Sequence, residues 1–288
     1  MTSTDAHPYL AIDLGGSNTR LGLFQSLDVP DFTLLGNFPT QSSYADQLEQ
    51  IATLLREQHV GGLVGVGVSV GARVARDGRS MAFGPNFPDY LDQPLAADLE
   101  ALLGCPVRLG HDTVCGLLSE RRFGALREAE RAGYLTVSTG TGAAIQLGKG
   151  EAALISSIEF GHQVLEDNER LCLCGQVGCL ETFTGGRQLE LRYGQPIMEF
   201  ADASFWHVFS SKLALGLLNL ALLARLDVVA VSGAIAVEND FLLAMVQEKI
   251  DASLKWGRLL LVRADLGVHA PLVGAASLLA VSETTILH

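Results

Sequence analysis

The sequence predicts an α/β protein built from two similar lobes, and two observations carry that prediction. Segments typical of strands and segments typical of helices alternate along the whole chain, which is the pattern of an α/β layer architecture. Each half also opens in the same way, with a strand, a glycine-containing turn and a second strand, at residues 9–24 and again at residues 134–147. The chain has 288 residues, of which 48% are hydrophobic, enough for one large core or two moderate ones.

The first half begins with an apolar run that ends in an acid, Asp13, and is followed by a glycine pair. Because residues 21–24 are apolar again, residues 13–20 are expected to connect two strands of a hairpin. Residues 43–59 carry apolar side chains at helical spacing. Four elements complete this half: a strand at 63–70, apolar as expected when both faces are covered, a helix at 94–103, a strand at 107–109 and a helix from 112 onward.

The second half repeats this order after its own glycine turn. Its expected elements are strands at 134–138 and 144–147, a helix at 205–226, a strand at 228–232, a helix at 240–254, a strand at 259–263 and a closing helix at 270–281. No low-complexity linker separates the halves, and the most loop-like join is expected at residues 110–112.

Charge and composition exclude several classes of protein. The formal net charge is −12, which argues against a nucleic-acid-binding surface. No signal peptide is expected at the polar amino terminus, and the uncharged run at 213–224 is too short to span a bilayer and is interpreted as a buried helix. Of the five cysteines, Cys105 and Cys115 lie in apolar surroundings and are expected to be reduced, as in a cytoplasmic protein.

The most specific feature is a cluster of one imidazole and three thiols, His162, Cys172, Cys174 and Cys179. These are the ligands that a tetrahedral structural zinc ion prefers, and four protein ligands close such a site. The short spacings need tight turns, which glycines between the cysteines can supply. The alternative is a set of ordinary thiols or disulfides, but the spacing favours zinc.

The two glycine turns are suited to phosphate. In the first, Gly15 and Gly16 let backbone N–H groups approach an anion, and the hydroxyls of Ser17 and Thr19 add donors. Asp13 could hold a hydrated magnesium ion. The second turn, residues 139–142, is of the same kind, and the two turns are expected to face each other across a cleft that holds a nucleotide.

With these motifs the chain resembles the ROK family of sugar kinases and repressors, within the superfamily of actin, heat-shock chaperone ATPases and sugar kinases. The resemblance covers nearly the whole chain. The segments that carry it are the two phosphate motifs (13–20 and 140–142), a sugar loop (67–71), the asparagine segment at Asn86, the catalytic aspartate at Asp112, the zinc and sugar signature (159–162 and 172–181) and the carboxy-terminal Gly-Ala-Ala (274–276).

The resemblance implies a two-lobed actin-like ATPase fold, related to ribonuclease H, with an interlobe cleft and a zinc-bearing loop. The smaller lobe would comprise residues 1–111 with a helix at about 271–288, and the larger lobe residues 112–270. The implied reaction is transfer of a phosphoryl group from ATP, with Mg²⁺, to a hexose hydroxyl, with O6 of glucose as the first choice. Asp112 would be the general base that accepts the proton of that hydroxyl. A cytoplasmic homodimer that binds neither nucleic acid nor membrane is expected.

The site residues follow from the same motifs. The nucleotide would be bound by Asp13, Gly15, Gly16, Ser17, Asn18, Thr19, Gly140, Thr141, Gly142 and Gly233. The sugar would be bound by Gly71, Asn86, His111, Asp112, Glu159, His162 and Glu181. The zinc ligands would be His162, Cys172, Cys174 and Cys179, with one nitrogen of His162 on zinc and the other toward the sugar.

The chain departs from the family pattern at several places. His111 stands where an asparagine is usual, Val70 where proline is usual, and residues 232–234 read Ser-Gly-Ala instead of three glycines. His111 can alternatively cap the helix that begins at Asp112, and Asp112 can be an acid stabilised by that helix dipole. The amino-terminal helix-turn-helix of the family's regulators is not seen ahead of the first strand, so DNA binding is not expected.

Three alternatives to a glucose kinase remain open at this point. One is a kinase for fructose, mannose, allose or an N-acetylhexosamine, and another is a sugar-binding sensor that has lost kinase activity, which the changes at His111 and Ala234 motivate. A chaperone-like ATPase is disfavoured by the metal loop.

Overall fold

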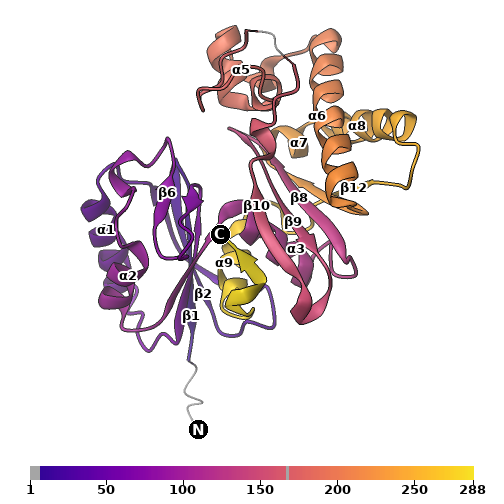
Figure 1. Cartoon of the computed structure of the whole chain (residues 1–288). Coiled ribbons are helices and arrows are strands. Elements are labelled where there is room, and N and C mark those ends of the chain that lie inside the picture. The colour runs from indigo at the N-terminus through magenta and orange to yellow at the C-terminus, as the bar shows by residue number, and fades with distance from the viewer. Residues whose placement is uncertain (1–6, 167–168) are drawn as a thin grey trace. The chain divides into compact units, whose positions relative to one another are not determined.

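The computed structural model describes residues 7–166 and 169–288, and its contacts divide into two compact units. The first unit comprises the chain up to Phe123 together with His269–His288, and the second comprises Gly124–Val268. Figure 1 shows the elements of both, coloured along the chain.

The first unit is built on a mixed sheet with strand order β3-β2-β1-β4-β7. Its strands are β1 (Tyr9–Leu14), β2 (Asn18–Phe24), β3 (Thr33–Pro39), β4 (Gly65–Val70) and β7 (Val107–His111). The three strands β1 to β3 are antiparallel because short turns connect them, whereas β4 and β7 run parallel to β1 and are reached through helices. Every residue of β4 is buried, as the continuous apolar run predicted.

Helices cover both faces of this sheet: α1 (Tyr44–Glu57), α2 (Leu95–Leu103), α3 (Asp112–Phe123) and α9 (Ala270–Leu278). The Ser43 side chain accepts a hydrogen bond from the Asp46 N–H and so caps α1. Figure 1 shows α9, in yellow, beside the indigo and purple strands, and it contacts β1, β4 and α3.

Two glycines allow α9 to approach its neighbours at backbone distance. A Cβ atom at Gly67 on β4 would lie 1.8 Å from the carbonyl oxygen of Ala275, and one at Gly274 would lie 1.8 Å from the carbonyl oxygen of Cys115. Both distances are far inside van der Waals contact, so only glycine fits at these positions. The remaining short elements of this unit are β5 (Arg73–Val74), β6 (Met81–Phe83), η1 (Pro88–Tyr90), η6 (Glu283–Thr285) and β13 (Ile286–Leu287).

The second unit repeats the order of the first sheet, because its own strands run β10-β9-β8-β11-β12. They are β8 (Arg131–Val137), β9 (Thr141–Leu147), β10 (Leu154–Ile158), β11 (Val228–Ser232) and β12 (Leu260–Arg263). Again the first three are antiparallel, and the last two run parallel to β8. This correspondence confirms the prediction of two similar α/β lobes.

The helices of the second unit are α4 (Glu181–Thr184), α5 (Gly186–Tyr193), α6 (Ala203–Ala224), α7 (Ala234–Glu238) and α8 (Asp240–Ser253), with short turns at η2 (Gly150–Ala152), η3 (Phe160–His162) and η4 (Ile197–Glu199). A further turn, η5 (Gly267–His269), precedes α9. Helix α6 packs against α8 and contributes Phe209, Leu213 and Leu217 to the core of this unit. In the described part of the chain it is the one helix long and apolar enough to cross a membrane, a test that a core helix also passes.

The structure corrects one sequence prediction and adds elements that the sequence did not predict. Residues 110–112 are not a loop: Gly110 and His111 end β7, paired with Ser69 and Val70, and Asp112 begins α3 directly. The compact units also differ from the expected lobes in the place of α3, which packs on α9 and lies in the first unit. The edge strand β3 and the short β10 were not predicted.

Candidate functional site

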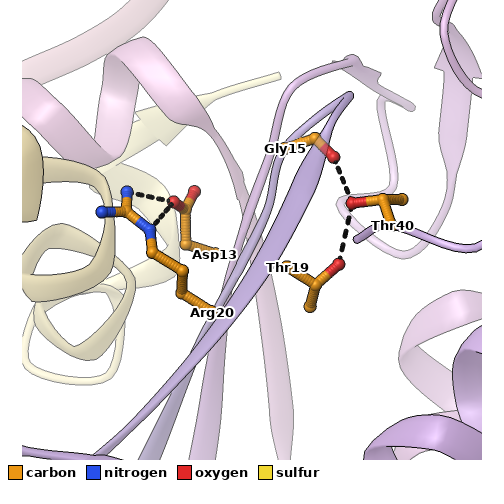
Figure 2. Close-up of polar contacts among 5 residues, drawn as sticks. All are labelled: Asp13, Gly15, Thr19, Arg20 and Thr40. Atoms are coloured by element: carbon orange, nitrogen blue, oxygen red, sulfur yellow. Dashed lines mark hydrogen bonds and ion pairs between the residues drawn. The ribbon is translucent and has the colours of Figure 1, made fainter. Parts of the chain in front are cut away.

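The first glycine turn is held from two sides by backbone and side-chain hydrogen bonds. The Gly15 N–H donates to the Asn18 carbonyl oxygen at 3.0 Å, which closes the turn. The Thr40 N–H donates to the Ser17 carbonyl oxygen at 3.0 Å, and the Thr40 hydroxyl donates to the Gly15 carbonyl oxygen at 2.6 Å (Figure 2). Gly16 is exposed at the tip of this turn.

Asp13, at the end of β1, forms an ion pair with Arg20 on the neighbouring strand. The distance from Arg20 Nη2 to Asp13 Oδ2 is 2.5 Å and that from Nε to the same oxygen is 3.0 Å (Figure 2). Burial raises the pKa of Asp13 above its ordinary value, Arg20 lowers it in part, and the negative charge of Asp112 adds to the rise. A magnesium ion on Asp13 would therefore share this carboxylate with Arg20 or displace the arginine.

Two residues predicted to bind sugar lie against the same turn. A Cβ atom at Gly16 would lie 2.9 Å from Asn86 Nδ2, and one at Gly71 would lie 3.8 Å from the Gly16 nitrogen. The first unit thus brings the phosphate turn, the loop after β4 and Asn86 together, although they are far apart in the sequence. Asn86 is exposed and Gly71 is half-buried.

His111 and Asp112 occupy the junction between β7 and α3. His111 Nδ1 accepts a hydrogen bond from the Thr113 N–H at 3.2 Å and lies 2.7 Å from the Thr113 hydroxyl oxygen, so His111 caps the start of α3. Asp112 Oδ1 lies 2.9 Å from His111 Nδ1, and this buried oxygen has no hydrogen-bond partner among the described residues. The structure therefore shows His111 as the cap of α3. Any contact of His111 with a sugar would have to use its other ring nitrogen, Nε2.

In the second unit, the side chain of Glu181, the first residue of α4, contacts the second glycine turn. Its Oε2 accepts a hydrogen bond from the Thr141 N–H at 2.9 Å, and a Cβ atom at Gly140 would lie 2.8 Å from the same oxygen. The Thr141 hydroxyl in turn lies 2.8 Å from the Thr184 hydroxyl oxygen on α4. The Thr141 N–H, at a turn predicted to bind phosphate, therefore donates its hydrogen bond to Glu181, a residue predicted to bind the sugar.

The segment that carries Glu159 and His162 runs directly beside this turn. A Cβ atom at Gly161 would lie 2.3 Å from the Thr141 carbonyl oxygen and 3.3 Å from Glu181 Oε2, so a side chain at Gly161 would separate the two segments. Glu159 is exposed just ahead of η3, and His162 is half-buried at its end.

The predicted metal ligands form a compact cluster. One ligand atom each of His162, Cys172, Cys174 and Cys179 lies within 4.8 Å of all the others. Two sulfurs that bind one zinc ion tetrahedrally are separated by about 3.8 Å, and the distance between Cys174 Sγ and Cys179 Sγ is 3.8 Å. Cys172 Sγ lies 3.7 Å from His162 Nδ1, which makes Nδ1 the nitrogen of His162 that faces the cluster. The donor set and the spacing fit a zinc ion.

The environment of the thiols differs within the cluster. Burial raises the pKa of Cys179 to about 12. Burial acts in the same direction on Cys174, but the hydrogen bonds from Gln176, Cys172 and Cys179 together outweigh it and the pKa of that thiol is lowered. Gln188 Nε2 donates to Cys172 Sγ at 3.3 Å. Donors of this kind stabilise thiolates, the form in which cysteine binds a metal.

The other predicted nucleotide residues are placed as follows: Ser17 and Asn18 are exposed at the first turn, Thr19 is buried beneath it, Gly142 lies in β9 opposite Thr136, and Gly233 precedes α7. Gly233 has a φ of +94°, and a Cβ atom there would lie 2.4 Å from the Val137 carbonyl oxygen. That position therefore requires glycine for its backbone, and Ala234 beside it is exposed.

Sequence reasoning missed the residues that support the site. Thr40 follows an edge strand that was not predicted, and Gln47, whose Nε2 donates to the Thr19 hydroxyl at 3.2 Å, lies in a segment that was interpreted only as a helix. Arg20 lay inside a quoted motif but was given no role. Its position seven residues after Asp13, across an expected hairpin, was the available signal.

With the fold and the two sites described, comparison with known proteins defines the class: the chain belongs to the ROK family, whose profile matches residues 9–281. It is 32% identical over 130 residues to a putative xylose repressor of Caldicellulosiruptor sp. (44% of this chain, 32% of that protein). It is 28% identical over 191 residues to a glucokinase of Streptomyces coelicolor (65% and 58%). It is 32% identical over 196 residues to an N-acetyl-D-glucosamine kinase of Salmonella typhi (62% and 63%). The chain thus spans less than two thirds of the length of these curated relatives.

Solved structures agree on the fold over most of the chain. The ROK hexokinase of Thermus thermophilus matches with a TM-score of 0.74 and 25% identity, covering 94% of this chain and 97% of that one. A ROK family glucokinase of Streptomyces griseus, solved with glucose and AMPPNP, matches with a TM-score of 0.74 and 23% identity, covering 94% and 98%. The likeness confirms the predicted fold class, that of ROK sugar kinases and the actin-like ATPases.

Proposed function

We propose that this protein transfers a phosphoryl group from ATP to a hydroxyl of a hexose. The observation that supports this most is the gathering of four groups in the first unit: the exposed Gly16 at the phosphate turn, the Asp13 carboxylate, the Asn86 amide and the Asp112 carboxylate. These are an anion-binding backbone, a metal-binding acid, a sugar-binding amide and a base, and phosphoryl transfer needs each of them.

In this proposal Asp112 accepts the proton of the attacking hydroxyl. Its Oδ1 is buried beside His111, but the Asp112 side chain as a whole is 37% exposed, so part of the carboxylate can be reached by a substrate hydroxyl. Asp112 also begins α3, where the positive end of the helix dipole attracts a negatively charged side chain. Asn86 would hold a sugar hydroxyl, and the N–H groups of the first turn would hold phosphate oxygens.

Magnesium would be bound with ATP near Asp13, where it would neutralise charge on the transferred phosphoryl group. Arg20 would then balance the charge of Asp13 before the metal arrives. The residues Ser17, Asn18, Gly140, Gly142 and Gly233 would complete the nucleotide site.

The cysteine cluster is proposed to bind a structural zinc ion. By fixing the loop that carries His162 and the helix that begins at Glu181, the metal would hold the sugar-binding groups of the second unit in place. Glu159, His162 and Glu181 would receive sugar hydroxyls, with Nε2 of His162 as the nitrogen that faces the sugar.

Glucose is the proposed acceptor, phosphorylated at O6, and N-acetylhexosamines, mannose, fructose and allose are the alternatives. The relatives include both a glucokinase and an N-acetyl-D-glucosamine kinase, so the acceptor is the part of the proposal that most needs measurement. A homodimer is proposed as the working assembly.

A second candidate is a sugar sensor without kinase activity, because one group at each predicted phosphate turn is already engaged. Arg20 binds Asp13, and Glu181 accepts the N–H of Thr141. A carboxylate at that second turn would repel phosphate unless it moves when the nucleotide binds.

The test is a screen of the purified protein with ATP, Mg²⁺ and each of these hexoses, in which the sugar phosphate is detected directly. Calorimetry with hexose and with ATP separately accompanies it. A kinase forms a sugar phosphate and binds both ligands. Hexose binding without ATP binding, and without product from any hexose, would establish the sensor instead.

A further inference from the structure

We propose that Thr40 and Gln47 are positioning residues for the phosphate donor, because they hold the Gly15–Gly16 peptide with its N–H directed outward. They act through a chain of four hydrogen bonds that leads from Gln41 through Gln47, Thr19 and Thr40 to Gly15, called here the Gln47–Thr40 chain. The inference rests on the proposed function, since it takes the first glycine turn as the place where ATP phosphates bind.

The direction of every hydrogen bond in this chain is fixed by its two ends. At one end the Gln41 backbone N–H donates to Gln47 Oε1 at 2.9 Å, so the Nε2 amide of Gln47 faces the other way and donates to the Thr19 hydroxyl at 3.2 Å. At the far end the Thr40 hydroxyl must donate to the Gly15 carbonyl oxygen. Each hydroxyl has only one proton. The Thr19 hydroxyl therefore donates to the Thr40 hydroxyl oxygen across their 2.9 Å separation.

The middle of the chain is enclosed, since Thr19 and Gln47 are buried whereas Gly15, Thr40 and Gln41 are half-buried, and a buried polar group is costly to leave without a partner. Thr19 is 0% exposed, Gln47 1% and Tyr90 2%. The Tyr90 hydroxyl donates to the Gln41 carbonyl oxygen at 2.5 Å and fixes the segment from which the chain starts. Buried hydrogen bonds that point in one direction also polarise one another, so the bond at Gly15 is strengthened by those behind it.

The consequence for the turn follows from the planarity of the peptide bond. In a trans peptide the carbonyl of Gly15 and the N–H of Gly16 point in opposite directions. Because Thr40 binds that carbonyl, the Gly16 N–H points away from Thr40. In the part of the chain that the structure describes, this N–H has no hydrogen-bond partner, and Gly16 is exposed. An outward N–H at a glycine is a donor for an anion.

Figure 2 shows that this arrangement is separate from the Asp13–Arg20 pair, since Thr19 and Thr40 lie on one side of the strands and the two charged side chains on the other. In the proposed function the Asp13–Arg20 pair lies where magnesium would bind. The Gln47–Thr40 chain, by contrast, carries no charge. Gln47 lies in α1, so the position of this helix and the orientation of the phosphate turn are coupled.

The test compares Thr40→Val with Thr40→Ser and with Thr33→Val, a control at the exposed start of β3. Valine has the shape of threonine but cannot donate to Gly15, so the Kd for ATP is expected to rise about tenfold, the equivalent of one hydrogen bond of about 1.4 kcal/mol. The Kd for the hexose should change less than about twofold, since Asn86 lies beside Gly16 but, among the described residues, neither Asn86 nor Asp112 forms a hydrogen bond with a member of the chain. Thr40→Ser should restore ATP binding, and Thr33→Val should leave it unchanged.

A second variant, Gln47→Met, interrupts the chain far from any ligand and keeps the test open if Thr40→Val folds poorly. Like Thr40→Val, it should weaken the binding of ATP more than the binding of hexose. Calorimetry and the rise in Tm that saturating ATP produces measure this difference. An equal loss of affinity for ATP and for hexose would indicate a merely structural role and overturn the inference. Unchanged ATP affinity in a folded Thr40→Val or Gln47→Met would also overturn it. A wild-type protein that binds hexose but no ATP would instead overturn the proposed function, and this role with it.

Discussion

The partly buried ion pair between Asp13 and Arg20 leads to a sharp prediction about stability. Arg20→Met keeps most of the aliphatic stem but leaves the Asp13 carboxylate buried without its cation. The two side chains are 10% and 22% exposed. Removal of one partner of a buried pair typically costs about 3–5 kcal/mol; because Arg20 retains some exposure, a loss of about 3 kcal/mol at pH 7 is expected.

The loss should depend on pH in a direction set by the pKa of Asp13. Burial already raises this pKa in the wild type, with Arg20 opposing the rise, so the variant should raise it further. A carboxyl group whose folded pKa lies above its unfolded value favours folding when protonated, and that contribution is lost as the pH rises through the folded pKa. The deficit of Arg20→Met relative to wild type should therefore grow from acidic to neutral pH, by at most about 1.4 kcal/mol per pH unit.

The assay is urea unfolding of the protein without metal or nucleotide at several pH values between about 5 and 7.5. Arg56→Met is the matched control, because Arg56 pairs with Glu49 at 68% and 72% exposure; exposed pairs contribute about 0.5 kcal/mol. Asp13→Asn should rescue most of the loss in the double variant. A deficit that is equal at all pH values, or no larger than that of Arg56→Met, would refute the reasoning.

Three further predictions concern the proposed chemistry. Asp112→Asn should lower kcat at least about 100-fold with little change in the hexose Kd, because an amide can bind the hydroxyl but cannot take its proton; near wild-type turnover would place the base elsewhere. Cys174→Ala should lower the zinc content of the purified protein, its Tm and its hexose affinity together, and metal analysis that finds well under one zinc per wild-type chain would contradict the site. His111→Asn should keep the cap on α3, with a change in stability under about 1 kcal/mol, and should shift the ranking of hexoses; an unchanged ranking would limit His111 to capping.

The sequence predicted those parts of the fold that depend on local patterns. The α1 helix begins where Ser43 supplies a cap, and β4 is buried throughout, as its apolar run indicated. The sequence also predicted that His162, Cys172, Cys174 and Cys179 come together, because these residues lie within a short segment, and the structure places one ligand atom of each within 4.8 Å of the others.

Predictions that depend on contacts between distant segments did not follow from the sequence. The most loop-like join was expected at residues 110–112, whereas Gly110 lies in β7, where a Cβ atom would lie 2.8 Å from Leu278 Cδ2 of α9. The engagement of Glu181 by the Thr141 N–H joins residues 40 positions apart. Neither contact leaves a periodic signal in the sequence.

The close packing of α9 has a consequence for synthesis on the ribosome. The helix fits against β4 and α3 at backbone distance through Gly67 and Gly274, yet it is translated only after the whole second unit has been made. Domains usually fold in the order in which they emerge. Here the second unit can complete its core during translation, whereas the first must wait, with the apolar face of its sheet uncovered, until residues 270–278 leave the exit tunnel. Nascent chains stalled before that point should be the ones that chaperones hold.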